Sequence, residues 1–339
     1  MNDRDHPDQS MSLQDIPLNA SDVLAAHERL HGWVQHTPLL SSPWLSRLAG
    51  RPVLLKAENL QVTGSFKARG AVNCLLQLPP AERTRGVVTA SAGNHGQAVA
   101  WAAAQLGIEA TIVLPIDAVP VKVERTRAWG AAVVQAGRGY DEAHWHAEAL
   151  AQRTGALYIP FEHADLIAGH GTVALEIFQE QPDIEVLVVP VGGGALVGGV
   201  GLATTARSPR PRVLGVQSDR TRAMHDALRA GHLVPVDTPP TLADGLAGQT
   251  SQSMLDLCRA LDIAVVLVPE ETLLYAIGET LRREHLAIEG SAAVTVAAVL
   301  GGLLPPGNGP IALILSGGNV DPGVLIQALA ATSDAPAAN

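Results

Sequence analysis

The sequence is poor in cysteine, aromatic residues and charge, and each shortage excludes a class of protein. Only two cysteines, Cys74 and Cys258, occur in 339 residues, in no zinc-binding or disulfide spacing, which fits a reducing, cytoplasmic location. Aromatic residues make up 3%, too few for stacking on nucleic-acid bases, and the net charge of −10 disfavours a phosphate-backbone partner. No apolar run approaches the roughly 20 residues of a membrane span.

In the sequence, short apolar runs alternate with Ala-rich segments that are typical of helices. The predicted strands are 52–56, 86–90, 110–114, 185–191, 212–216, 263–268 and 310–315. The predicted helices are 21–33 with Ser21 as N-cap, 67–76, 95–106, 168–179, 271–284 and 292–303. Strands that are apolar throughout and separated by amphipathic helices indicate parallel sheets covered on both faces, and hence an α/β protein.

The first segment with side chains suited to catalysis is Thr63–Gly70, which places Lys67 in the first turn of a predicted helix. The N-terminus of a helix is already positive, so it disfavours a protonated amine and suits a lysine that forms a Schiff base. Phe66 lies beside it and is one of only three phenylalanines. The alternative interpretation is an ordinary solvated surface lysine.

The second segment, Ser91–Gln97, directly follows the predicted strand 86–90. Ser91 and Asn94 bring a hydroxyl, an amide and backbone N–H groups to a helix start, which can bind a carboxylate. Alternatively, Asn94 is only a helix cap. His95 in such a place more often has a structural role than a catalytic one.

Two further segments follow buried strands. In Val191–Leu196, successive glycines let backbone N–H groups turn toward a phosphate at a helix N-terminus, unless the turn serves only helix–sheet packing. The dinucleotide fingerprint fails because Val197 replaces its third glycine, and no P-loop lysine follows. A single phosphate monoester, such as that of pyridoxal phosphate (PLP), therefore fits best. Ser316 ends the last predicted strand, or else belongs to a plain polar turn.

Together, these segments resemble the fold-type II PLP enzymes, most closely the serine/threonine dehydratases and the related serine racemases. The resemblance is carried by ENLQVTGSFKARGA (58–71), SAGNHGQA (91–98), PVGGGALVGG (190–199) and LSGGNVD (315–321). It implies two open parallel-sheet domains with the cofactor between them: a large domain of residues 19–85 and 163–330, and an inserted small domain of residues 86–162. Residues 1–18 and 331–339 are predicted to be flexible tails, and the relatives imply a homodimer or homotetramer.

The resemblance also implies a set of site residues. Lys67 would form the internal aldimine with PLP and then remove the substrate α-proton. The other expected cofactor contacts are Phe66, Asn94, Gly192, Gly193, Gly194, Ala195, Leu196, Glu289 and Ser316. The expected substrate contacts are Ser91, Ala92, Gly93, Asn94 and His95. No metal site is expected, because Gln217 replaces the acidic ligand that some relatives use.

The implied reaction is α,β-elimination of L-threonine or L-serine to 2-oxobutanoate or pyruvate and ammonia, by a catabolic-type enzyme without a regulatory domain. Racemases of the family have a second serine where Ala92 stands, so dehydration is favoured over serine racemisation. Dehydration of 3-hydroxyaspartate is another alternative within the family. Outside it, a nicotinamide-dependent oxidoreductase using Asp219 and a non-catalytic PLP-binding protein remain open.

Overall fold

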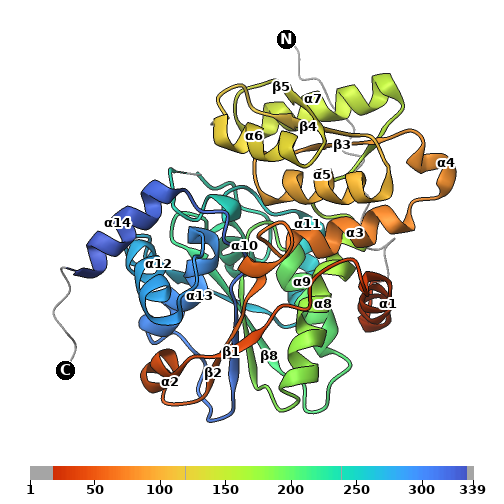
Figure 1. Cartoon of the computed structure of the whole chain (residues 1–339). Coiled ribbons are helices and arrows are strands. Elements are labelled where there is room, and N and C mark those ends of the chain that lie inside the picture. Colours follow the sequence, from red (N-terminus) through yellow and green to blue (C-terminus); the bar gives the residue numbers. More distant parts are fainter. Residues whose placement is uncertain (1–17, 119, 238, 334–339) are drawn as a thin grey trace.

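The computed structural model describes residues 18–118, 120–237 and 239–333, which form two open sheets with helices packed around them (Figure 1). The larger sheet has the strand order β1-β2-β10-β7-β8-β9 and the smaller one β5-β4-β3-β6. Strands of the larger sheet are β1 (Leu39–Ser41), β2 (Val53–Lys56), β7 (Val186–Pro190), β8 (Arg212–Ser218), β9 (Ala264–Val268) and β10 (Ile311–Ile314). Strands of the smaller sheet are β3 (Val87–Ala90), β4 (Ala110–Leu114), β5 (Ala132–Gln135) and β6 (Leu157–Tyr158).

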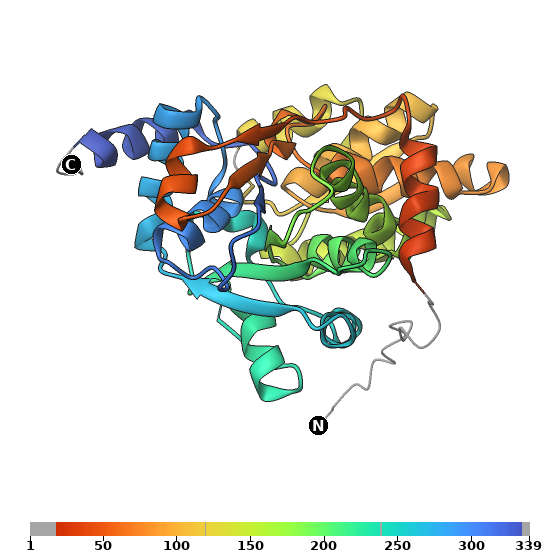
Figure 2. The same cartoon turned by 90° about the horizontal axis from the view of Figure 1, so that it is seen from below.

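The helices in the first half of the chain are α1 (Ala20–Leu30), α2 (Pro43–Ala49), α3 (Lys67–Gln77), α4 (Pro80–Arg83), α5 (Asn94–Leu106), α6 (Pro120–Ala128) and α7 (Gly139–Thr154). Those in the second half are α8 (Ala164–Glu180), α9 (Ala195–Thr204), α10 (Ala223–Ala230), α11 (Gln252–Ala260), α12 (Glu271–Glu284), α13 (Gly290–Leu300) and α14 (Pro322–Ser333). The 3₁₀ turns among the described residues are η2 (Glu58–Leu60) and η3 (Asp244–Leu246). Figures 1 and 2 show α1 and α14 at opposite ends of the molecule.

The expected α/β architecture is confirmed, and every predicted strand is present to within two residues at either end. Each pairs in parallel with its neighbours, except that β2 is also bordered by the antiparallel edge strand β1. One capping prediction was wrong. Helix α1 begins at Ala20, and its N-cap is Asn19, whose side chain accepts the backbone N–H of Ser21.

The central strand β7 shows why the runs are apolar throughout. Val186 and Val188 belong to the hydrophobic core that includes α12 and α13, whereas Leu187 and Val189 belong to the core that includes α8 and α9. Successive side chains of a strand point to opposite faces, so a sheet covered on both sides needs apolar residues at every position.

Helix α3 packs between the two sheets (Figure 1). Its apolar side chains Ala71, Val72 and Leu75 belong to the core cluster of the smaller sheet, although α3 lies in the segment predicted for the large domain. The strands of the larger sheet come from residues 39–56 and 186–314, and those of the smaller sheet from residues 87–158. Because α3 packs on both halves, the boundaries of the two domains remain a prediction.

The structure describes only the inner ends of the two predicted tails. Helix α14 continues to Ser333, three residues beyond the predicted boundary at 330, and Thr332 is buried. Residues 1–17 and 334–339 lie outside the described part of the chain. No helix among the described residues is long and apolar enough to cross a membrane.

Candidate active site

The lysine segment and the segment after β10 lie against each other. The backbone N–H of Phe66 donates to the Ser316 carbonyl at 3.1 Å, and Ser65 forms an isolated antiparallel bridge with Gly317. One residue further out, the Gly318 N–H donates to the Gly64 carbonyl at 2.9 Å. These main-chain bonds bring the start of α3, and with it Lys67, beside Ser316.

A chain of side-chain hydrogen bonds joins the second segment to this site. The Asn94 amide donates to Glu289 Oε1 at 2.8 Å and accepts from Asn319 Nδ2 at 2.8 Å. Asn319 also donates to the Thr63 carbonyl at 2.9 Å. The amide orientation of Asn94 is therefore fixed from both sides. Asn319 was not predicted as a site residue, although it stands in the Ser-Gly-Gly-Asn segment that the sequence marks.

Lys67 is half-buried and has no direct ion-pair partner among the described residues. Within the described residues, its Nζ has no hydrogen-bond or ion-pair partner, and it lies 4.9 Å from the centroid of the Phe66 ring. Burial lowers the pKa of Lys67 to about 8, against the opposing effect of the Glu289 charge. The direction is the one expected from the sequence, and burial is its largest cause. A neutral amine is the form that attacks a carbonyl.

Glu289 is a buried carboxyl on the other side of Asn94. Burial, and then the charge of Asp244, raise the pKa of Glu289 to about 7, and the hydrogen bond from Asn94 opposes this rise. Near neutral pH, Glu289 is therefore only partly ionised. Because it does not carry a full charge, it does not hold Lys67 firmly in the protonated state.

The glycine turn lies between β7 and α9 and presents unpaired donors. Among the described residues, the backbone N–H groups of Gly192, Gly193 and Gly194 have no hydrogen-bond partner. They precede the ten-residue helix α9, whose N-terminus carries a partial positive charge. A Cβ on Gly193 would lie 2.5 Å from the Phe161 ring, so a side chain there would require this ring to move. Ala195 is the first helical residue, and its methyl group leaves the N–H free.

The donor set fits a phosphate monoester next to an aldehyde-binding amine, as in PLP. Phe66 shares one hydrophobic cluster with Val191, Ala195 and Leu196, so the lysine segment and the glycine turn border the same core. The buried hydroxyls of Ser65 and Ser291 have no partner within the described residues. Unsatisfied polar groups of this kind are expected where a polar cofactor completes a site.

The segment expected to contact substrate divides into two parts. Residues 91–94 are partly exposed, and Ser91 Oγ accepts the Gly93 N–H at 3.1 Å. His95 is buried instead, with Nε2 3.1 Å from Thr89 Oγ1. Thr89 donates its own proton to the Ile159 carbonyl, so His95 must be the donor to Thr89. Burial, and then the Lys67 charge, lower the pKa of His95 to about 3. The ring is therefore neutral, and its one N–H is already used.

His170, on α8, is a feature of the site that sequence reasoning missed. Its ring is fully buried, packs edge-on against Phe66 at 4.8 Å between centroids, and has no partner for either nitrogen within the described residues. Burial, and then the Lys67 charge, lower the pKa of His170 well below its usual value. A neutral His170 supports Phe66 without adding charge beside Lys67. No local motif in the sequence signals this contact.

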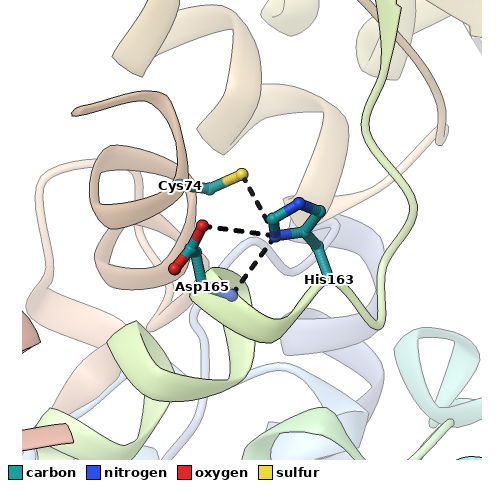
Figure 3. Close-up of side chains that lie close together, drawn as sticks. All are labelled: Cys74, His163 and Asp165. Carbon is teal, nitrogen blue, oxygen red and sulfur yellow. Dashed lines mark hydrogen bonds and ion pairs between the residues drawn. The ribbon is translucent and has the colours of Figure 1, made fainter. Parts of the chain in front are cut away.

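A second cluster consists of Cys74, His163 and Asp165 (Figure 3). Cys74 lies on α3 two helical turns after Lys67, whereas His163 and Asp165 belong to the start of α8. Cys74 Sγ and Asp165 Oδ2 approach the same atom, His163 Nδ1, at 3.7 and 3.6 Å. That nitrogen also accepts the Asp165 backbone N–H at 3.2 Å, so His163 caps α8. Burial raises the pKa of the Cys74 thiol, which stays protonated. The arrangement is that of a capped helix end.

Fold and site together define an α/β protein with a half-buried lysine of lowered pKa, a phosphate-type glycine turn and no nucleotide fingerprint. A sequence profile described as "Pyridoxal-phosphate dependent enzyme" matches residues 31–317, and the chain belongs to this family.

Within this family, the chain is similar to individual curated proteins and solved structures. The chain is 43% identical over 306 residues to the L-threonine ammonia-lyase of Thermotoga maritima, covering 90% of this chain and 76% of that protein. It is 35% identical to the catabolic L-threonine dehydratase TdcB of Escherichia coli K12, covering 91% of this chain and 94% of that one. Maize serine racemase superposes with a TM-score of 0.87 at 31% identity, over 93% of this chain and 98% of that one. The processed form of threonine deaminase isoform 2 from Solanum lycopersicum superposes with a TM-score of 0.85 at 32% identity, over 93% and 87%.

Proposed function

We propose that this protein is a PLP-dependent ammonia-lyase that converts L-threonine, L-serine or both to 2-oxobutanoate or pyruvate and ammonia. The similarity to threonine ammonia-lyases over about nine tenths of the chain supports the reaction. The observation that carries the proposal within the molecule is Lys67, a half-buried amine with no ion-pair partner among the described residues and with a pKa lowered to about 8.

In this proposal, each group of residues holds one part of the cofactor. Lys67 is the covalent anchor, and the N–H groups of Gly192–Leu196 bind the phosphate. Asn94 contacts the ring oxygen and Ser316 faces the ring nitrogen, while Phe66 and Glu289 border the ring. When bound, the cofactor withdraws the electron pair left at the substrate α-carbon.

The chain's own residues then bind the substrate and move its protons. The loop Ser91–His95 binds the substrate carboxylate, with the Ser91 hydroxyl and Asn94 amide nearest to it. Once the substrate amine has taken its place on the cofactor, Lys67 Nζ would be free to take the α-proton and would pass that proton to the β-hydroxyl, which would leave as water. Water then converts the released enamine to the 2-oxo acid and ammonia, so water is returned overall. Ser316 is neutral, so it does not force a proton onto the ring nitrogen as a carboxylate would.

Serine racemase activity is the second candidate, because the chain superposes on maize serine racemase with a TM-score of 0.87. Racemisation needs a proton donor on the face opposite Lys67, and Ala92 offers only a methyl group in the substrate loop. Elimination is therefore favoured. 3-Hydroxyaspartate remains an alternative substrate for it.

We also propose a cytoplasmic homodimer or homotetramer with a large domain of residues 19–85 and 163–330 and a small domain of residues 86–162. Both cysteines are free and buried, which suits a reducing compartment. Light scattering after size-exclusion chromatography tests the oligomeric state, and limited proteolysis near residues 85 and 163 tests the boundaries.

The decisive experiment is a 2-oxo acid assay on the purified protein with L- and D-serine, L- and D-threonine and 3-hydroxyaspartate, together with chiral analysis of the remaining serine. We expect a PLP absorption band and 2-oxo acid from the L-substrates, and neither in Lys67→Ala. An unchanged spectrum in Lys67→Ala contradicts the lysine assignment, and D-serine formed from L-serine without pyruvate would favour the racemase.

A further inference from the structure

A closed cluster of buried charges lies on the side of α3 away from Lys67. Its members are Lys56, Glu58, Arg69 and Glu176, called the charge cluster below, and each side chain is at most 4% exposed. Two cations face two carboxylates, so the charge cluster is neutral as a whole. The partners are up to 120 residues apart in the sequence.

Arg69 is the centre of this cluster. Its guanidinium binds Glu58 through Nε and Nη2 at 2.8 and 2.7 Å, and binds Glu176 through Nη1 and Nη2 at 2.6 and 2.8 Å. Lys56 Nζ donates to Glu176 Oε2 and to the Thr37 carbonyl, both at 2.6 Å. Burial alone would lower the pKa of Arg69, but the two carboxylates raise it. Such two-pronged bonds restrict orientation as well as distance.

The cluster is coupled to Lys67 through the first turn of α3. This helix starts at Lys67 and has no side-chain cap on its N-terminus. With 3.6 residues per turn, Arg69 points roughly opposite to Lys67, one into the cluster and the other toward the site. Arg69 therefore anchors the uncapped turn on which Lys67 stands.

The cluster is also coupled to Ser316, through the end of β2. The carbonyl of Lys56 accepts the N–H of Leu315 at 3.0 Å, directly before Ser316. The carboxylate of Glu176 joins Lys56 to Arg69, because each of them contacts it. One cluster thus ties the turn that bears Lys67 to the strand end that precedes Ser316.

We propose that the charge cluster is a positioning device that fixes Lys67 relative to Ser316, the two residues assigned to opposite parts of the cofactor. The inference rests on the proposed function, because the separation matters only if Lys67 carries PLP. Buried ion pairs often add little net stability compared with apolar residues of the same volume, whereas their geometry is strict. Arg69 touches no reacting group, so it is a positioning residue.

The test uses the purified holoenzyme of Arg69→Lys, which keeps the charge but loses the planar fork. We expect kcat to fall by about 10- to 100-fold with little change in KM, as for a small misplacement of a reacting group. The absorption band of bound PLP should also change its position or its pH midpoint. Glu58→Gln, an isosteric change that leaves the Glu176 contacts in place but one buried positive charge unbalanced, provides a second variant with effects in the same direction.

A matched control separates positioning from stability. Glu279 on α12 is also a buried carboxylate (1% exposed) held by two arginines, Arg282 and Arg283, and it lies outside the charge cluster. Glu279→Gln should lower the unfolding temperature while leaving kcat and the PLP band unchanged. If folded Arg69→Lys and Glu58→Gln keep the wild-type kcat and band, the cluster is only structural. If the wild-type band does not depend on Lys67, the proposed function fails instead.

Discussion

Gly194, the last residue of the glycine turn, offers the sharpest test of the phosphate site. Its φ is +115°, a backbone region that favours glycine, and it is the N-cap of α9. A Cβ added there would lie 2.9 Å from Met254 Cβ and 3.0 Å from Met224 Cε. The Met224 methyl can turn away, but Met254 Cβ is fixed to the backbone of α11. Gly194→Ala must therefore strain or shift the turn.

The expected size follows from these two contacts. A residue held in a sparsely populated φ region costs about 1–3 kcal/mol. If the free turn relaxes to avoid this strain, its N–H groups move away from the phosphate position, and the cost is transferred to cofactor binding. Since 1.4 kcal/mol corresponds to tenfold, the Kd for PLP should rise about 10- to 100-fold. PLP titration of the apoprotein, followed by visible absorbance, measures it.

The control is Gly231→Ala at the C-cap of α10. Gly231 has a φ of +78°, and no heavy atom lies within 4 Å of the position that an added Cβ would take. This variant should lose about 1–2 kcal/mol of unfolding free energy from backbone strain alone, with an unchanged Kd for PLP. If Gly194→Ala binds PLP as tightly as the wild type, the turn does not hold the phosphate and the reasoning is refuted.

Three further predictions concern packing and pH. Gly199→Ala should destabilise the fold by about 1–3 kcal/mol in urea unfolding, because its Cβ would lie 2.3 Å from the Ile167 carbonyl oxygen and 2.7 Å from Gly171 N, where α8 and α9 touch; an unchanged midpoint would contradict this. The raised pKa of Glu289 stabilises the apoprotein below the unfolded-state pKa, and this contribution is lost as pH rises to about 7. Glu289→Gln should therefore flatten the pH dependence of unfolding free energy by up to about 3 kcal/mol, whereas a parallel profile would count against it. PLP capture by the apoprotein should accelerate as pH rises toward the Lys67 pKa of about 8 and then level off; stopped-flow rates that do not vary between pH 6 and 9 would speak against the lowered pKa.

The success of strand prediction depended on burial. The run 110–114 was located to the residue as β4, because its last three side chains are fully buried and apolar. Strand β5 was missed because it has only four residues, Ala132–Gln135, and lies at the edge of the smaller sheet, where three of its four side chains are exposed. Strand β6 has only two residues, too few for any periodic pattern.

The site could be predicted where its chemistry is local. Lys67, the glycine turn and Ser316 stand in short segments with their own signature, and the structure brings the first and last together through the Phe66–Ser316 hydrogen bond. The charge cluster could not be predicted, because nothing local links Glu58 and Arg69, which stand in the segment 58–71, to Glu176. Arg69 and Glu176 are 107 residues apart, and charged residues are ordinarily on the surface. Only the packing of α3 on α8 makes them partners.

The first turn of α3 combines two opposite electrostatic environments, which the position of these residues in the helix does not reveal. Arg69 is kept charged by two carboxylates, whereas Lys67, two residues earlier, is half-buried with no ion-pair partner in the described part of the chain, and its pKa falls. The helix terminus acts on both residues, so it cannot account for the opposite shifts of their pKa values. The faces they occupy do: one side of the turn meets Glu58 and Glu176, and the other meets Phe66 and a partly protonated Glu289. Opposed environments on adjacent groups are typical of catalytic sites, because they leave one group inert and the other reactive near neutral pH.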